Sequence, residues 1–507
     1  MCECRRLFLD DTHVESRQGL IRSFHQAEKY GGNPVVVPDL PWERAMGHNH
    51  GTVLLEEGRF RYWYQTYAFA REAAGTFHCA YAESTDGIRW EKPLLGRHDL
   101  NGDRRNNVVA YDIGGVNIVH DDHDRDPAGR YKMLYWGSGA DKPGAISGWM
   151  GSAGSWGWCA ASSPDGLDWR PHPDNPIYLA AADDGSVLGF DPTEQAYVAF
   201  LRPVTWKPGQ RAMEPDTYDA TIGSLHGGDE GRPAPVDEGM RRFPHMRLVG
   251  RATSTDFVHW SPTSTVMVPD EEDPEGVELY SMPVAIYQGW YLGLLYILYG
   301  DPDEPKIRKK GFMDIQLAAS RDGITWRRVG GHQPLIPRGS RGEFDAGMVG
   351  PNNGLVERDG RIWLYYNGWT GEHRETKAYR RANDPGLFEM GRLGCGTGLA
   401  WLRQDGFISV DAGEDEGTLT TKPERLGGVR IFVNARTAGP GGTLMVEVLP
   451  GEGNASGTVL ARGAFRGDKV DAEVGGDDLQ RLPPGKYRLR FRLRSGSLYS
   501  YRLAAGE

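Results

Sequence analysis

One short motif recurs along the chain at intervals of 66–91 residues, and it constrains the fold more than any other feature. It reads Ser-x-Asp-Gly-x-x-Trp, with Phe in place of Gly in the third copy and a degenerate fifth copy. In such a turn the Asp accepts backbone N–H bonds, the Gly takes a positive φ and the Trp packs on a sheet. We therefore interpret these residues as structural. The copies are Ser84–Trp90, Ser163–Trp169, Ser254–Trp260, Ser320–Trp326 and Arg403–Ser409.

Between the copies, apolar and polar residues alternate in paired runs joined by turns such as Glu57-Gly58 and Asp359-Gly360. Each unit offers about four strands and ends in the motif. Four-stranded units repeated five times predict an all-β chain that forms a five-bladed β-propeller. Residues 206–243 lengthen the step between the second and third copies, and they are rich in Gly, Pro and acids. We predict that they form an insertion loop in blade 3.

The pattern changes near residue 417, where the motif stops and shorter alternating runs begin, including Thr443–Leu449 and Tyr487–Leu493. Gly and Pro turns separate these runs, which is typical of a compact β-sandwich. We therefore predict two domains. They are a propeller catalytic domain at residues 1–416 and an accessory C-terminal β-sandwich at residues 417–507.

Charge and cysteine content narrow the cellular setting. The 507 residues carry a net charge of −11, which argues against a nucleic-acid partner and against docking on anionic lipid. The N-terminus has no apolar run of a signal peptide, and the five Cys are too few and too scattered for a disulfide framework. We expect a cytoplasmic protein that needs no cofactor. The sequence leaves its oligomeric state open.

Several segments carry a resemblance to a known group of enzymes. They are the Ser-x-Asp-Gly-x-x-Trp turns, the variant Asp256–Trp260, the strand Gly289–Leu295, and Arg403–Ser409 followed by Glu416–Pro423. With them, nearly the whole chain resembles the propeller glycoside hydrolases of families 32, 43 and 68, and its end resembles bacterial family-32-like proteins. The resemblance implies a propeller with a C-terminal sandwich and three carboxylates in an axial pocket, acting on a furanoside such as a fructoside or arabinoside.

Acidic residues stand at the heads of otherwise apolar innermost strands, where buried acids are costly unless they line a cavity. Glu278 lies where the resemblance places an acid, just before an apolar strand, and we predict it to be the general acid. Asp345, in the next unit, is the expected ionised partner. Asp183 and Asp184, which precede the strand of the third unit, are further candidate catalytic carboxylates; the alternative is that one of them caps the turn at Gly185.

The first unit departs from the resemblance because it has Gly47-His48-Asn49-His50-Gly51 where an Asp is expected. His48 and His50 lie two apart on a strand and share a face, so they could ligate a metal or hydrogen-bond sugar hydroxyls. We favour sugar binding and predict no metal site. The predicted substrate-binding residues are His48, Asn49, His50, Asn117, Trp42, Tyr280, Glu343 and Asn352.

The sequence therefore predicts a glycoside hydrolase that cleaves a small carbohydrate in an axial pocket. Two other classes of function stay open because of the missing Asp in the first unit. One is a carbohydrate-binding protein that does not hydrolyse. The other is a lyase or transferase that acts on a sugar-bearing metabolite with His48 or His50 as its base.

Overall fold

The computed structural model is all-β: strands and a single 3₁₀ turn at Pro127–Gly129 make up the regular structure of the described residues. No helix in this part of the chain is long and apolar enough to cross a membrane. The predicted insertion at 206–243 and Asp183 lie outside the described residues. The structure describes residues 4–43, 45–70, 73–100, 102–111, 113–138, 156–178, 184–203, 247–300, 311–373, 394–426, 429–452, 458–476, 479 and 482–505.

Three separate four-stranded antiparallel sheets follow one another along the chain, each a set of sequence neighbours. The first contains β5 (Ala45–Glu56), β6 (Arg59–Ala70), β7 (Ala73–Ser84) and β8 (Val108–Tyr111). The second contains β9 (Gly114–His120), β10 (Tyr131–Ser138), β11 (Trp156–Ser163) and β12 (Arg170–Pro171). The third contains β13 (Gly185–Asp191), β14 (Ala196–Leu201), β15 (Val249–Ser254) and β16 (Ser264–Met267).

A larger ten-stranded sheet follows, and one parallel pairing, Met313 with Met348, joins its two antiparallel halves. Its first half contains β17 (Val277–Ser281), β18 (Val284–Tyr287), β19 (Trp290–Gly300), β20 (Gly311–Ser320) and β21 (Trp326–Ile336). Its second half contains β22 (Met348–Pro351), β23 (Val356–Arg358), β24 (Arg361–Trp369), β25 (Cys395–Arg403) and β4 (Glu28–Lys29).

The repeated motif forms the turn that its sequence predicts. In the first copy Asp86 Oδ1 accepts hydrogen bonds from the backbone N–H groups of Ile88 and Arg89, both at 2.8 Å. Gly87 has a φ of 76°. Its carbonyl accepts a hydrogen bond from Tyr365, which lies on β24, at 2.8 Å. The turn that follows β7 of the first sheet therefore contacts β24 of the ten-stranded sheet.

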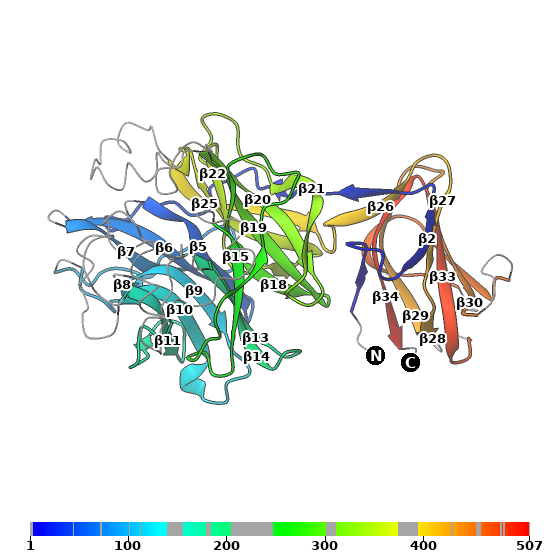
Figure 1. Cartoon of the computed structure of the whole chain (residues 1–507). Helices are drawn as coiled ribbons and strands as arrows, with labels where there is room; N and C mark the ends of the chain where they lie inside the picture. The colour runs from blue at the N-terminus through cyan, green and yellow to red at the C-terminus, as the bar shows by residue number, and fades with distance from the viewer. Residues whose placement is uncertain are drawn as a thin grey trace.

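Two further sheets make up a separate lobe at the C-terminal end (Figure 1). The N-terminal strands β1, β2 and β3 pair with C-terminal strands in them, which the sequence did not predict. The predicted domain boundary at residue 416 stays a prediction. Because of this pairing, residues 6–24 belong to the same two sheets as the strands that follow that boundary. One sheet contains β1 (Arg6–Leu7), β3 (Ile21–Phe24), β26 (Ile408–Ala412), β29 (Val429–Thr437), β32 (Asp468–Glu473) and β34 (Gly496–Ala505). The other contains β2 (Val14–Gln18), β27 (Gly417–Thr421), β28 (Glu424–Leu426), β30 (Thr443–Pro450), β31 (Ala461–Phe465) and β33 (Gly485–Arg494).

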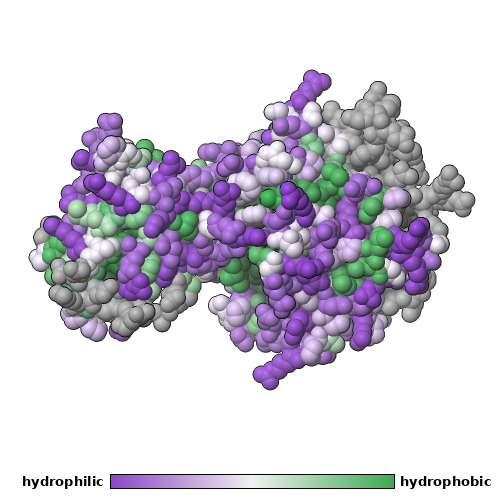
Figure 2. Space-filling view, turned by 180° about the vertical axis from the view of Figure 1, so that it is seen from behind, coloured by the Kyte–Doolittle hydropathy of each residue, from purple (hydrophilic) through white to green (hydrophobic). Residues whose placement is uncertain are grey.

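The two lobes meet at a narrow waist (Figure 2), yet they share one hydrophobic core cluster. That cluster runs from Trp290 in the large sheet through Phe407 to Leu503 in β34. At the same junction the buried carboxylate of Asp405 accepts hydrogen bonds from Tyr287 and Ser500, each at 2.5 Å, and pairs with Arg5. Apolar and polar contacts therefore connect the lobes.

Candidate functional site

Polar side chains from several sheets converge where the first strands of the sheets lie side by side. Asn49 Nδ2, on β5, donates a hydrogen bond to Asp184 Oδ1 at 2.9 Å and approaches Ser281 Oγ at 3.5 Å. His50 Nε2 lies 3.1 Å from the same Asp184 oxygen. Residues of the first, third and fourth units thus meet in one buried cluster, which we call the axial cluster. Its members are Asn49, His50, Asp184, Arg202, Arg247, Glu278, Tyr280, Ser281 and His373.

A distortion in β5 aims the first unit into this cluster. The pairing of β5 with β6 shifts register between Met46 and Gly51, and His50 has a φ of 74°. Such bulges redirect side chains and are frequent at functional sites. Here the bulge holds Asn49 and His50 beside Asp184. The sequence Gly47–Gly51 that departs from the resemblance is therefore the part of β5 that reaches the axial cluster.

Asp184 and the arginine that pairs with it, Arg202, lie at the two ends of one hairpin. Asp184 precedes β13, and Arg202 follows β14, so the two residues face each other across this strand pair. Arg202 Nη2 donates to Asp184 Oδ2 at 2.6 Å and to the carbonyl oxygen of Tyr280 at 3.1 Å. Both side chains are buried, with 4% of Asp184 and 8% of Arg202 exposed. The guanidinium stabilises the ionised form of this carboxylate.

Glu278 has an equivalent partner. Its buried carboxylate pairs with Arg247, whose backbone carbonyl accepts a hydrogen bond from Leu279 N–H at 2.9 Å. The sequence predicted apolar walls that would keep Glu278 protonated. The buried guanidinium of Arg247 instead favours the ionised carboxylate. The contact of Glu278 with Arg247 was not anticipated from the sequence, and the predicted role of Glu278 as general acid stays a prediction.

The ring of Tyr280 lies between these two ion pairs. The guanidinium carbons of Arg202 and Arg247 are each 4.9 Å from its centroid, within range of cation–π attraction. The hydroxyl of Tyr280 lies 3.2 Å from Nε2 of the buried His373. Tyr280 therefore connects the Asp184 and Glu278 carboxylates through their arginines, and the axial cluster contains two carboxylates and two guanidiniums.

Two predicted asparagines lie in buried hydrogen-bond networks. Asn117 on β9 accepts a hydrogen bond from Asn353 at 2.6 Å. Asn352 donates to Tyr62 at 3.1 Å and also bonds Asn367. These networks connect neighbouring sheets.

Asp345, Glu343 and Trp42 make other contacts or are exposed. Asp345 is buried, but it pairs with Lys29 at 2.7 Å and accepts a hydrogen bond from Tyr366 at 2.8 Å, on the side of β4 and β24. Glu343 is exposed. Trp42 donates its indole N–H to Asn107 at 2.8 Å. Asp183 and the side chain of His48 lie outside the described residues, so their predicted roles stay predictions.

Sequence reasoning missed Arg202, Arg247 and His373. Arg202 follows the apolar strand β14, and Arg247 stands within the run Met246-Arg247-Leu248-Val249. A cation inside an apolar run is a signal of a buried ion pair, since burying an unpaired charge is costly. Its partner could not be identified, because the pairs are 18 and 31 residues apart.

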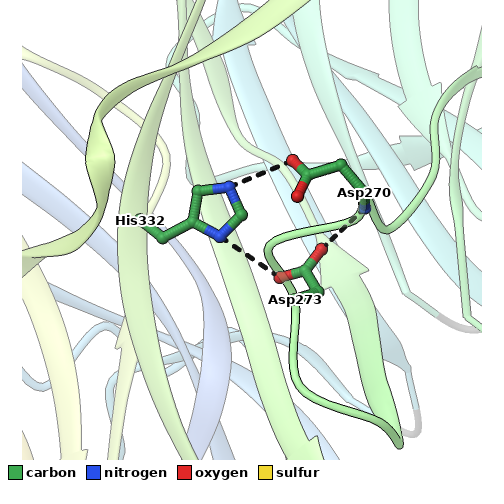
Figure 3. Close-up of side chains that lie close together, drawn as sticks. All are labelled: Asp270, Asp273 and His332. Atoms are coloured by element: carbon green, nitrogen blue, oxygen red, sulfur yellow. Dashed lines mark hydrogen bonds and ion pairs between the residues drawn. The ribbon is translucent and has the colours of Figure 1, made fainter.

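One other group of side chains has the composition of a metal site. Asp270, Asp273 and His332 offer ligand atoms within 4.8 Å of one another (Figure 3). His332 Nε2 lies 3.0 Å from Asp270, and Nδ1 lies 3.5 Å from Asp273. However, both oxygens of Asp273 accept hydrogen bonds from Arg328, each at 2.6 Å. Because Arg328 already neutralises and occupies Asp273, we assign these residues to an ion-pair network.

Comparison with known proteins finds similarity in three-dimensional structure alone. No protein-family profile and no curated protein sequence matches the chain. A glycosyl hydrolase from Bacteroides ovatus is 16% identical, with a TM-score of 0.45 over 75% of this chain and 94% of that one. A structure from the GH130 family of mannoside phosphorylases, which contains glycoside hydrolases that target β-1,2 mannosidic linkages, is 16% identical. Its TM-score is 0.44 over 75% of this chain and 94% of that one. A putative glycosidase from Bacteroides thetaiotaomicron is 14% identical, with a TM-score of 0.44 over 74% of this chain and 96% of that one. Similarity at this level assigns neither a family nor an activity.

Proposed function

We propose that the chain is a glycoside hydrolase whose active site is the axial cluster. The observation that carries this proposal is that two buried carboxylates from different sheets, Asp184 and Glu278, pair with arginines that both lie against the ring of Tyr280. Glycosidic bonds are usually cleaved by groups that flank the bond, one donating a proton and the other acting as base or nucleophile. The furanoside class of substrate comes from the sequence resemblance.

The scaffold in this proposal is a five-bladed β-propeller followed by a C-terminal β-sandwich. Contacts between neighbouring sheets support a closed ring. Thr52 on β5 accepts a hydrogen bond from Ile118 on β9, and Ser186 on β13 donates one to the carbonyl oxygen of Met282, beside β17. Asn353 N–H donates to the carbonyl oxygen of Gly51 at 2.6 Å, a contact between the last and first units that supports closure of the ring.

The chemical roles follow from the charges. Glu278, ionised by Arg247, acts as the base or nucleophile. Asp184 positions the imidazole of His50, whose Nε2 lies 3.1 Å from Asp184 Oδ1. His50 then donates its proton to the leaving oxygen, which general acid catalysis requires. Arg202 and Tyr280 position the two carboxylates and do not transfer protons.

A substrate screen tests this proposal. Nitrophenyl furanosides and pyranosides and short fructans are incubated with the full chain, with and without inorganic phosphate. Release of nitrophenol or free sugar without phosphate supports hydrolysis. Release only with phosphate would assign phosphate, in place of water, as the acceptor. No turnover of any glycoside would overturn the proposal.

A second candidate is a carbohydrate-binding protein that does not cleave its ligand. It is favoured by one observation: both carboxylates are almost fully buried and held by guanidiniums, with 4% of Asp184 and 1% of Glu278 exposed. Calorimetric titration with the same sugars distinguishes the two functions. Sugar binding without turnover that is unchanged in Glu278→Gln favours the binding protein.

A further inference from the structure

The outer face of one C-terminal sheet is rich in basic side chains. Along β33 every second residue is buried, from Tyr487 to Leu493, and the residues between them are basic and point to the other face. The N-terminal strand β2 and the strands β27, β28, β30 and β31 complete this sheet. We call this surface the arginine face. Its basic residues are Lys486, Arg488, Arg490, Arg492 and Arg494 on β33, Arg462 on β31, and Arg425 on β28 opposite Lys486.

A buried carboxylate organises the centre of this face. Glu447 on β30 is 1% exposed, and it pairs with Arg462 and Arg490, each at 3.2 Å, and with Arg492 at 3.5 Å. The arginines themselves remain accessible, with 62% of the Arg462 side chain and 36% of the Arg492 side chain exposed. One carboxylate thus holds three guanidiniums while they keep donors for a ligand.

Carboxylates neutralise only part of the face. Besides Glu447, Glu416 pairs with Arg492 at 2.6 Å and Glu15 with Arg488 at 2.5 Å, so seven basic groups face three acids. The wider charge distribution follows the same trend. Residues 6–24 and 408–505, which form this lobe, contain 17 Lys and Arg against 15 Asp and Glu, whereas the whole chain has a net charge of −11. The acidic excess of the chain therefore lies outside this lobe.

We propose that the arginine face binds an acidic polysaccharide, a polymer of sugars that carry carboxylates. Arginines two apart on a strand stand about 7 Å apart, a spacing suited to charges carried on successive sugars. Duplex DNA carries a charge about every 1.7 Å, and the acidic remainder of the chain would repel it more strongly. The residues opposite Arg490 and Arg492 are Glu447, Met445, Thr420 and Thr418, none aromatic, so charge and hydrogen bonds replace stacking on neutral sugars.

The proposal that this face binds a polyanion is based on the geometry of the face alone. The choice of a polysaccharide among polyanions rests on the proposed function. Lys486→Glu with Arg494→Glu reverses two exposed charges and leaves the contacts of Glu447 in place. Arg130→Glu with Lys469→Glu is the matched control, because it changes the net charge equally at exposed sites elsewhere. Binding of the full chain to polygalacturonate and to its neutral methyl ester is measured by calorimetry at 50 and 300 mM NaCl.

We expect polygalacturonate to bind at 50 mM NaCl and about tenfold more weakly at 300 mM, because binding releases counterions. The methyl ester should not bind. The face variant should lose about tenfold in affinity while the control stays within about twofold. No binding of polygalacturonate, an equal loss in the control, or tighter binding of duplex DNA would each overturn the proposal. Cleavage of small glycosides, assayed separately in both variants, reports on the axial cluster alone, so the two proposals fail independently.

Discussion

Asp314 is a buried carboxylate that forms no salt bridge with an arginine or lysine among the described residues. It lies on β20, is 7% exposed, and its Oδ1 atom makes no hydrogen bond. Burial raises the pKa of Asp314 from 3.8 to about 6. A carboxyl with a raised pKa in the folded state stabilises the fold only while it is protonated. Asp184 and Glu278, by contrast, each pair with an arginine.

Replacing Asp314 with Asn should therefore stabilise the protein in a pH-dependent manner. A pKa difference of one corresponds to about 1.4 kcal/mol, so the free energy of unfolding should rise by up to about 3 kcal/mol at pH 8. The gain should shrink as the pH falls through 6 and vanish below 3.8, where Asp314 is protonated in both states. Urea unfolding at pH 4, 6 and 8 measures it, with Asp122→Asn, which removes a fully exposed charge, as control. A gain that does not depend on pH would contradict this origin.

At the scale of the element, the repeated turn is where sequence and structure agree best. Its hydrogen bonds are local, so the residues that make them are adjacent in the sequence. The same reasoning could not predict that β1, β2 and β3 join C-terminal strands, because pairings between residues about 400 positions apart leave no local pattern. Nor could it show that Asp345 turns toward Lys29, which lies on β4 of the same large sheet.

Gly87→Ala tests whether the turn also connects neighbouring sheets. A Cβ at Gly87 would lie 2.6 Å from the hydroxyl of Tyr365, whereas one at Gly58 would meet nothing within 4 Å. Both glycines have a similar positive φ, so Gly58→Ala measures the backbone cost alone, about 1–2 kcal/mol. Gly87→Ala should lower the free energy of unfolding by about 1–3 kcal/mol more than Gly58→Ala does, because its Cβ is overpacked against Tyr365. Equal losses in urea unfolding would show that the contact with Tyr365 contributes nothing.

At the scale of the whole molecule, the shared core predicts that the two lobes unfold together. Asp405, in the degenerate fifth copy of the motif, does not cap its turn as the first four do. It instead pairs with Arg5 and accepts hydrogen bonds from Tyr287 and Ser500, which belong to different sheets. The fifth copy of the motif can be recognised in the sequence, but the contacts of Asp405 cannot, because they involve the distant N-terminus and β34.

Asp405→Asn should therefore weaken the junction. It keeps the size of the side chain and a residue that tolerates the positive φ, but it removes the charge that pairs with Arg5. We expect the free energy of unfolding to fall by about 3 kcal/mol, because Arg5 loses its buried charged partner at the junction. Calorimetry should show a single unfolding transition in the parent protein. Two separate transitions in the parent would contradict a shared core.

The central claim, that the axial cluster cleaves glycosides, is tested most directly by kcat/KM for one nitrophenyl glycoside selected by the substrate screen. Glu278→Gln and Asp345→Asn are compared, since both replace a buried carboxylate by its amide but only Glu278 belongs to the axial cluster. Loss of a catalytic base should lower kcat/KM by about 10²–10⁴-fold. Asp345→Asn should stay within about tenfold once folding is confirmed by circular dichroism. Full activity of Glu278→Gln, or a larger loss in Asp345→Asn, would contradict the claim.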